Sequence, residues 1–362
     1  MRPLSLATVR VTRVLRPFIA LSLLSLGACG FVDTRQSMPM IAERWISEAT
    51  PESIDSVASW RTSEDKMLVF ATAKDSGTVR VYDASDGRFL RSLGNAGTAP
   101  GEFDRPNGIF IVDGLAFVVE RDNHRVQVVA LDSNRFLGSF GADDLRVPYG
   151  LWVWPQGDRR FRIYVTDSYY TPDDRVPPAD QLGERVKLFD VSLDDDAVDA
   201  RLVRTFGETA GEGVLNTVES IWGDPVNGRL LIADENARRL DVKVYDLSGH
   251  FTGLLVGSGQ FDYEPEGIAL IECGTVGDGY WLISDQHASK QVFRLFDRRS
   301  LAPVGAFVPQ ATRMVDGVWF QPGAFAGFLG GALFSQDADE AVVAFDWMDI
   351  AAALSLRSDC GR

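Results

Sequence analysis

Six short segments of the chain share one pattern of apolar and polar positions. In each segment the apolar residues alternate with polar ones or form a continuous β-branched run, and the segment ends at an aspartate. Both patterns are typical of β-strands, and an aspartate favours the turn that follows. The segments are VRVYD, VVALD, VKLFD, VKVYD, FRLFD and VVAFD, which end at Asp83, Asp132, Asp190, Asp246, Asp297 and Asp346. The spacings between successive aspartates are 49, 58, 56, 51 and 49 residues, so the chain carries six copies of a unit of about 50 residues.

Each unit holds three further predicted strands. A hairpin partner follows the aspartate strand, as in FLRSLG (Phe89 to Gly94), and another strand precedes it, as in MLVFATA (Met67 to Ala73). The innermost strand comes first, and its copies are SVASW, PNGIFIV, PYGLWVW, VESIWGD, PEGIALI and VDGVWFQ. Six units of four strands predict an all-β fold, a six-bladed β-propeller with four-stranded antiparallel blades around a central channel. A helical period is present only in WMDIAAALSL (Trp347 to Leu356), and the proline-rich stretch from Pro172 to Gly183 reads as an insertion loop of the third blade.

Composition narrows the classes of partner. The 362 residues are 45% hydrophobic, which is enough for a large core and excludes a disordered chain. With 36 Lys and Arg against 51 Asp and Glu, the net charge of −15 opposes general attraction to nucleic acid. We therefore expect no nucleic-acid partner, and a polyanionic ligand would need bound cations that reverse the local field.

The first residues predict export. Four arginines precede the apolar run from Phe18 to Ala28, which is too short to span a bilayer comfortably. LGAC resembles the lipobox of bacterial lipoproteins, which implies lipidation of Cys29; an ordinary cleaved signal with an incidental cysteine is the alternative. Gly30 after that cysteine resembles outer-membrane lipoproteins. The expected organisation is a signal peptide at 1–28, a lipidated tether at 29–41 and the propeller at 42–362, held at the cell envelope through its lipid anchor and facing the periplasm or the cell surface.

Two further cysteines remain, Cys273 and Cys360. An exported protein lies in a compartment that permits disulfides. We predict that the two residues pair and tie the C-terminus to the fifth blade, because closing that loop limits fraying. Two free thiols are the alternative.

Equivalent positions at the starts of the innermost strands should form a ring at one mouth of the channel. Four of the six ring residues are carboxylates, and their mutual repulsion would raise their pKa values unless a cation neutralises them. Glu235 and Glu264 add two acids close by, and Glu264 and Glu266 would share one face of an extended strand. Hard oxygen ligands without nearby His or Cys favour calcium, whereas solvated rim charges are the alternative. The ring residues are Asp55, Asn107, Tyr149, Glu219, Glu266 and Asp316.

The same residues carry a family resemblance. VESIWGDPVNGRLLIADEN (Val218 to Asn236) resembles the segment of calcium-dependent β-propeller phytases that holds two calcium-binding glutamates sixteen residues apart, as Glu219 and Glu235 are here. EPEGIAL, DGYWLISDQ, MVDGVWF and FSQDADE continue the similarity in the same order, and it covers nearly all of the chain after the tether.

This resemblance implies a set of roles. Glu219, Glu266 and Tyr149 would lie at the catalytic mouth, and Arg121 and Lys74 would bind phosphate through a donor fork and a point charge. The implied reaction is release of phosphate from phytate or a related small-molecule phosphoester by a water that Ca²⁺ activates, in a monomeric enzyme. The implied calcium ligands are Asp55, Glu219, Glu235, Glu264, Glu266 and Asp316.

Three departures reduce the expected set of ligands and cations. Where the family has an adjacent aspartate pair followed by proline, this chain reads Asp55, Ser56 and Val57. Ser168 stands in place of an expected phosphate-binding lysine, and PQATRMV replaces an acid-rich stretch. We therefore expect weaker calcium and phosphate binding than in the family, or another phosphoester as substrate.

Two other functions fit parts of the sequence. GEFDRPNGIFIV and ERDNHRVQVVALD resemble the NHL-type propeller repeat, which implies noncatalytic binding of a protein, peptide or polymer at the cell envelope. A six-bladed calcium-dependent lactonase needs one ion held by a few Glu, Asp and Asn ligands, for which Asn107 and Glu266 are candidates.

Overall fold

The computed structural model describes residues 38–194, 197–235, 240–287, 289 and 291–360. The predicted signal peptide, Cys29 and most of the predicted tether lie outside these residues. Within the described ranges, no helix combines the length and the apolar character needed to cross a bilayer.

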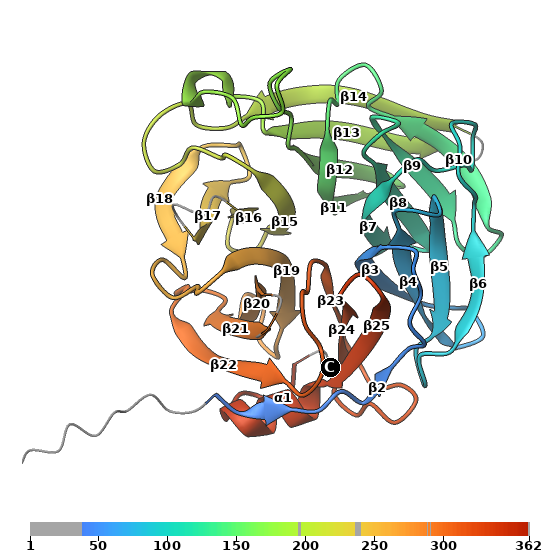
Figure 1. Ribbon diagram of the computed structural model, residues 1–362, viewed down its shortest axis with the longest axis vertical. Helices are drawn as coiled ribbons and strands as arrows, with labels where there is room; N and C mark the ends of the chain where they lie inside the picture. Colours follow the sequence, from blue (N-terminus) through green and yellow to red (C-terminus); the bar gives the residue numbers. More distant parts are fainter. Residues whose placement is uncertain (1–37, 195–196, 236–239, 288, 290, 361–362) are drawn as a thin grey trace, which may run out of the picture. The chain divides into compact units, whose positions relative to one another are not determined.

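Six antiparallel sheets surround one centre, and each is a meander whose first strand lies innermost (Figure 1). The predicted six-bladed β-propeller is confirmed. The first three blades contain β3 (Ile54–Arg61), β4 (Met67–Ala73), β5 (Thr78–Asp83) and β6 (Phe89–Leu93); β7 (Pro106–Val112), β8 (Leu115–Glu120), β9 (Arg125–Ala130) and β10 (Arg135–Phe140); and β11 (Pro148–Gly157), β12 (Arg160–Asp167), β13 (Val186–Asp194) and β14 (Ala197–Phe206). The last three contain β15 (Val218–Asp224), β16 (Arg229–Asp234), β17 (Asp241–Asp246) and β18 (Phe251–Val256); β19 (Glu264–Glu272), β20 (Gly279–Gln286), β21 (Val292–Asp297) and β22 (Pro303–Pro309); and β23 (Val318–Gln321), β24 (Ala332–Asp337) and β25 (Ala341–Asp346).

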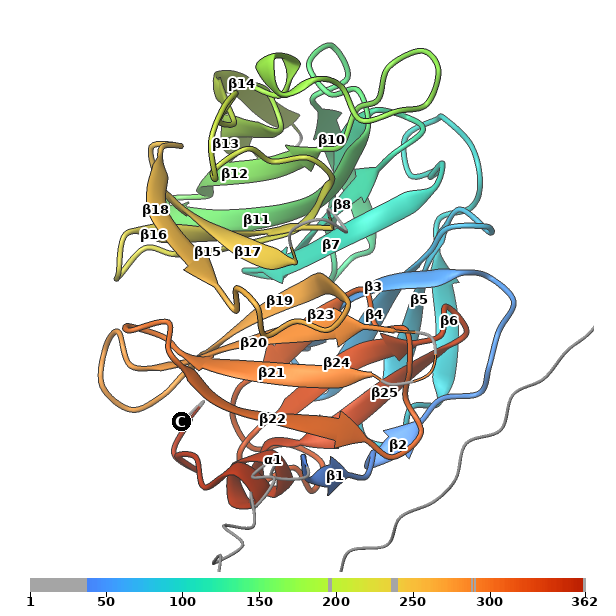
Figure 2. The same ribbon diagram turned by 60° about the vertical axis from the view of Figure 1, so that its left-hand side comes forward.

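The N-terminal residues complete the last two blades. The short strand β2 (Trp45–Ile46) pairs antiparallel with β25 and supplies the fourth strand of the sixth blade. Before it, β1 (Met40–Ile41) adds a parallel fifth strand beside β22 (Figure 2). The regular structure thus begins two residues before the predicted start at 42. Covering the edges of β25 and β22 leaves fewer unpaired backbone groups in these two sheets.

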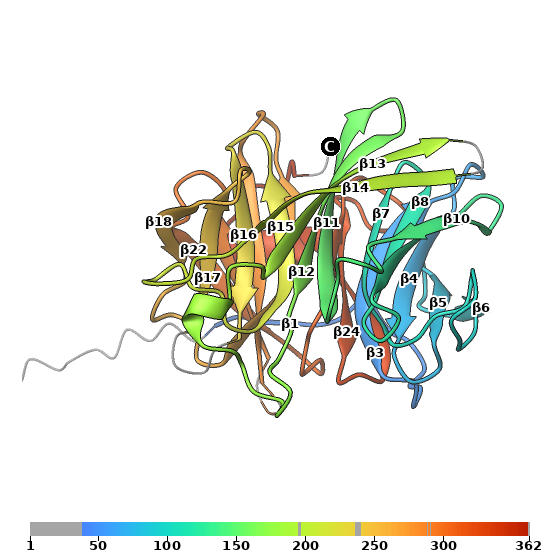
Figure 3. The same ribbon diagram turned by 90° about the horizontal axis from the view of Figure 1, so that it is seen from above.

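The third blade carries the predicted insertion. Between β12 and β13 the chain makes a long loop with a single 3-10 turn, Ala179–Gln181. The blade then continues with the nine residues of β13 and the ten of β14, which extend outwards in the side view (Figure 3).

The C-terminus forms the predicted helix, α1 (Trp347–Leu354). Asp346 caps it by accepting a hydrogen bond from the Met348 backbone N–H, and Trp347, Ile350 and Ala351 are buried against blades five and six. Beyond the helix, Cys360 forms a disulfide with Cys273. The predicted pairing is therefore confirmed.

Five innermost strands share one interruption of register at the predicted ring position. Two residues there have no paired partner on the second strand, as in a β-bulge, which re-aims a side chain. In the third blade the Thr166 hydroxyl fills the gap, accepting from the Gly150 N–H (2.8 Å) and donating to the Glu219 carbonyl of the next blade (2.8 Å). The interruptions fall at Asp55 and Ser56, Asn107 and Gly108, Tyr149 and Gly150, Glu219 and Ser220, and Glu266 and Gly267.

Small residues bring neighbouring innermost strands into contact at this level. The residue after each ring position is glycine or serine in all six blades. A Cβ added at Gly150 would lie 2.2 Å from the Glu219 carbonyl oxygen, and one added at Gly267 would lie 2.2 Å from the Asp316 carbonyl oxygen. The ring residues of adjacent blades therefore sit as close together as their backbones allow.

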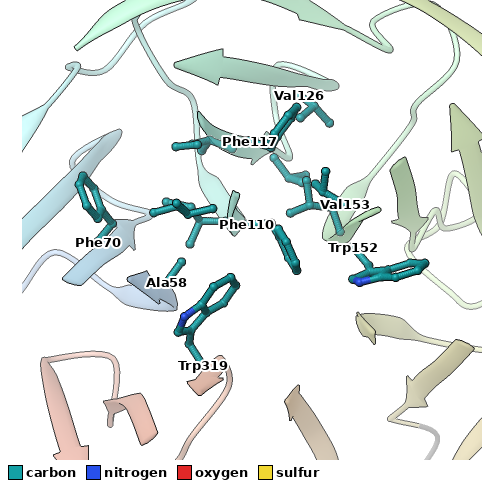
Figure 4. Packing of buried hydrophobic residues seen from close by; sticks show 14 of the residues in the cluster. Ala58, Phe70, Phe110, Phe117, Val126, Trp152, Val153 and Trp319 are labelled. Carbon is teal, nitrogen blue, oxygen red and sulfur yellow. The ribbon is translucent and has the colours of Figure 1, made fainter. Parts of the chain in front are cut away.

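Aromatic side chains close the channel beneath the ring. Phe110, Trp222 and Trp319 come from alternate blades, and their ring centroids lie 5.2, 5.0 and 5.4 Å apart pairwise. Figure 4 shows Phe110 and Trp319 facing each other among the buried residues. A ligand would therefore approach the ring from the opposite mouth.

Buried ion pairs hold the loops at that mouth. In four blades an acid near the end of the second strand pairs with a base on the third strand and accepts backbone N–H groups from the loop between blades, such as those of Asn216 and Thr217. These acids are structural, because each already has a cation and backbone donors as partners. The pairs are Glu120 with Arg125, Asp167 with Lys187, Asp234 with Lys243 and Asp285 with Arg294.

The contact between strands predicts a specific sensitivity. We expect Gly150→Ala to lower the free energy of unfolding by about 1–3 kcal/mol, because its Cβ would overlap the next backbone. Gly183→Ala is the control, since its Cβ would meet a methyl group of Thr209 at 3.3 Å and the Gly207 carbonyl oxygen only at 3.9 Å. We expect it to change stability by no more than about 0.5 kcal/mol. Urea unfolding followed by tryptophan fluorescence measures both, and equal stabilities would contradict the packing argument.

The disulfide predicts a second effect. Replacing both Cys273 and Cys360 by serine should lower the free energy of unfolding by about 2–4 kcal/mol, because the 87-residue separation is no longer closed in the unfolded chain. Urea unfolding with and without dithiothreitol checks this result. The reductant should destabilise the wild-type protein by a similar amount and leave the double variant unchanged.

Candidate functional site

The structure brings five of the six predicted ring residues together. Asp55, Tyr149, Glu219, Glu266 and Asp316 line one cavity of about 20 Å³ at the mouth of the channel, with the small residues that follow them. They come from five different blades. The convergence results from the shared bulge and from the close approach of the innermost strands.

Asn107, the sixth ring residue, does not line this cavity. It is fully buried in β7, and its side-chain oxygen and nitrogen have no hydrogen-bond partner among the described residues. A buried amide without partners is costly. The Asn107 side chain is therefore an unsatisfied hydrogen-bond donor and acceptor at the level of the ring, as far as the described residues show.

Three glutamates form the closest group of acids. Carboxylate oxygens of Glu219, Glu235 and Glu266 all lie within 4.8 Å of one another. Glu219 and Glu235 belong to one hairpin, in which Val218 pairs with Asp234, so their sixteen-residue spacing puts both at the same end of β15 and β16. The Glu235 Oε1 atom is buried and has no hydrogen-bond partner among the described residues.

Glu264 does not join this group. The register of β19 breaks after Pro265, and the bulge ends the simple alternation that would place Glu264 and Glu266 on one face. Glu264 is exposed, whereas Glu266 is buried. That Glu264 and Glu266 bind one ion together stays a prediction, and Glu264 acts electrostatically on both Glu235 and Glu266.

The remaining ring acids have partners of their own. The Lys74 ammonium lies 3.0 Å from the Asp55 carboxylate, with both side chains buried. Asp316 accepts a hydrogen bond from the Gln286 side chain and forms another with Asp339. Sequence reasoning assigned Lys74 to phosphate binding and did not single out Gln286 or Asp339.

A positional signal for two of these residues is present in the sequence. In the first five blades the residue before the ring position pairs with a residue of the second strand, and the residue after that partner lies at the same mouth. Lys74, Arg121, Ser168, Glu235 and Gln286 occupy this position. Aligning the second strands as well as the innermost ones would have placed Lys74 and Gln286 beside the ring.

Two other predicted positions lie at the same mouth. Arg121 is one-third exposed, and its guanidinium donates to Asp122 at 2.7 Å. Ser168 is buried, and its hydroxyl accepts the Val218 N–H at 3.1 Å. Tyr170, which the sequence did not single out, is partly exposed and hydrogen-bonds to Ser168.

Burial and like charge raise the pKa values of the ring acids. Burial, then Glu235 and Asp55, raise the pKa of Glu219 well above its usual value, against the opposing effects of Lys74 and a hydrogen bond with Tyr149. Burial, then Glu235 and Glu219, do the same to the pKa of Glu266. Burial, then Glu264 and Asp316, raise the pKa of Glu235 to about 8. The glutamate group therefore holds protons at neutral pH when no cation is bound.

The donors fit a hard divalent cation. All three close groups are carboxylates, with no His or Cys beside them, and one buried oxygen lacks a partner. Calcium takes such oxygen ligands in flexible arrangements. Binding it would remove both the repulsion and the unsatisfied acceptor.

The raised pKa of Glu235 predicts how the stability of the metal-free protein depends on pH. An ordinary glutamate has a pKa of 4.5, whereas Glu235 in the folded protein has one of about 8. Between these values the folded state binds more protons than the unfolded chain, so stability is highest at the acid end and falls as the pH rises. We expect the Tm in EDTA to decrease from about pH 6 to about pH 8.

Glu235→Gln should flatten this dependence, and the exposed-residue control Glu48→Gln should retain it. Differential scanning calorimetry across the pH range makes the measurement. A slope in Glu235→Gln equal to that of the wild type would contradict the assignment.

Comparisons with known proteins identify the fold. No family model and no curated protein matches the chain. Among solved structures, a chain of a nidogen/laminin complex is 15% identical, with 78% of this chain and 89% of that chain covered and a TM-score of 0.52. A member of the DUF4221 family from Bacteroides vulgatus is 8% identical, with 86% and 98% covered and a TM-score of 0.50. These likenesses show a β-propeller fold and nothing finer.

Proposed function

We propose that the protein is a calcium-dependent phosphoester hydrolase of the phytase type, which releases phosphate from phytate or a related small-molecule phosphoester at this mouth. The observation that carries the proposal is the group of Glu219, Glu235 and Glu266 within 4.8 Å. A divalent ion bound by these buried carboxylates would stabilise their ionised forms in place of the protons that they otherwise hold.

Each residue has a distinct part in this proposal. Glu219, Glu235 and Glu266 would hold Ca²⁺, which supplies a positive charge that polarises a phosphoryl oxygen and favours ionisation of water. Tyr149 hydrogen-bonds to Glu219 and fixes the orientation of that carboxylate. Arg121 at the rim offers the guanidinium donors that its bond to Asp122 leaves free for a phosphate oxygen.

The fold favours hydrolysis at one mouth only. Phe110, Trp222 and Trp319 close the channel below the ring. A phosphoester therefore enters and its products leave on the side where Arg121 and Tyr170 lie. With the predicted lipid on Cys29, we propose that a monomeric enzyme works at the outer membrane, facing the periplasm or the cell surface.

Noncatalytic binding is the second candidate. Both cations expected to bind phosphate already have acidic partners, Lys74 with Asp55 at 3.0 Å and Arg121 with Asp122 at 2.7 Å. Fewer free cations favour a ligand that is not a polyphosphate, such as a peptide or a polymer. The nidogen/laminin structure shows that propellers of this shape occur in protein complexes.

An assay of released phosphate decides between the two candidates. We expect the wild-type protein to release phosphate from phytate or from p-nitrophenyl phosphate with calcium and not with EDTA. Glu219→Gln and Glu266→Gln should each lower the rate by about 100-fold, because they remove charge that holds the ion. Glu48→Gln, an exposed-residue control, should retain the wild-type rate. Calcium-loaded, folded protein without activity on either substrate would favour the binding function.

A further inference from the structure

The acids at the mouth divide into two groups with different partners. Glu219, Glu235 and Glu266, from blades four and five, form no ion pair with a lysine or arginine among residues 38–235, 240–287, 289 and 291–360. Asp55, Asp316 and Asp339, from blades one and six, lie around Lys74. The ring therefore has one half without an ion pair among the described residues, on which Lys74 acts only at longer range, and one half with its own cation.

Lys74 is a buried cation in the second half. Its side chain is 9% exposed, that of Asp55 is 1% exposed, and the Nζ to Oδ1 distance is 3.0 Å. Burial by itself lowers the pKa of Lys74, but Asp55, Asp316 and Asp339 together raise it above the usual value. The ammonium is therefore charged, and three acidic groups act on it electrostatically, not Asp55 alone.

The other contacts in this half complete its hydrogen bonding. Gln286 donates to Asp316, and Asp339 shares a hydrogen bond with Asp316. The Ser56 N–H donates to the Thr72 hydroxyl, which holds the bulge that carries Asp55. In the glutamate half Tyr149 hydrogen-bonds to Glu219, and Glu219 to Glu235, whereas Glu235 Oε1 has no partner among the described residues.

We propose that the Lys74 ammonium takes the place of a second divalent cation, so that the ring binds one Ca²⁺ at Glu219, Glu235 and Glu266 and Asp55 is the partner of lysine and not a metal ligand. This inference rests on the proposed calcium site and deepens it. Of the acids that the family resemblance implies as calcium ligands, some would thus bind the ion and others would pair with Lys74.

The charges explain why a second ion does not bind while Lys74 is present. A divalent ion beside Asp55 and Asp316 would lie close to a buried ammonium, and like charges at short distances repel strongly. Without the ammonium, Asp55, Asp316 and Asp339 become a group of uncompensated carboxylates. Such a group offers oxygen ligands of the kind that calcium takes.

The experiment counts calcium ions per protein molecule by equilibrium dialysis, with isothermal titration calorimetry as the second readout. We expect one ion in the wild-type protein and two in Lys74→Met, which keeps the length of the side chain and removes its charge. Lys74→Arg keeps the charge and should bind one ion. Lys74→Gln, which can still hydrogen-bond to Asp55, should bind two and provides the neutral variant if Lys74→Met does not fold.

Two results would overturn the proposal. One is a wild-type protein that binds two ions or none, and the other is a folded neutral variant at position 74 that still binds one. Circular dichroism in calcium identifies the folded variants. Asp55→Asn combined with Lys74→Met removes both charges of the pair and should bind one ion again.

The outcome for hydrolysis is separate. One ion in the wild type and two in Lys74→Met, without phosphate release by either protein, would support the role of Lys74 and reject the hydrolase. Calcium-dependent phosphate release by a wild-type protein that holds two ions would support the hydrolase and reject the role of Lys74.

Discussion

Repulsion between carboxylates held close together is the constraint on which the functional end of this propeller depends. The six innermost strands meet at positions occupied only by glycine or serine, and five of them place one side chain into the same small space. Burial and mutual charge then raise the pKa values of Glu219, Glu266 and Asp316 well above the ordinary range. Two features lower this cost: the glutamates bind protons or the divalent ion that we propose, and a lysine pairs with Asp55.

The packing around the ring holds the carboxylates in place from both sides. The aromatic layer of Phe110, Trp222 and Trp319 lies three residues after the ring positions and excludes solvent from one side. The paired acids on the second strands, such as Asp234 with Lys243, fix the loops on the other side. Rigid surroundings of this kind keep the ring from relaxing outwards, so charge must be balanced locally.

Much of this arrangement could be predicted from the sequence because a propeller repeats its register. Once six units are aligned, a position in one blade identifies its counterparts, and Glu219, Glu266, Asp316 and Asp55 follow at once. The partners were harder to foresee. Lys74 lies directly after the second strand of the first blade and pairs with Asp55 on the innermost strand. Whether such a cation binds a ligand or a neighbouring carboxylate depends on distances in the folded protein, which a local sequence pattern does not contain. The register shift at Glu266 could not be foreseen for a similar reason, since a bulge changes the alternation of faces without changing the composition of the strand. Strands as short as β1 and β2 have no period to detect.

The N-terminal strand β2 closes the propeller by joining the sixth blade. Trp45 pairs with Ala344, so two residues at nearly opposite ends of the polypeptide must meet before the sixth sheet is complete. Contacts so distant along the chain form late and slow the folding reaction. The sixth sheet can therefore be completed only after Ala344 has been synthesised. The disulfide joins Cys273 to Cys360, which is synthesised later still, so both closures must wait for nearly the whole polypeptide.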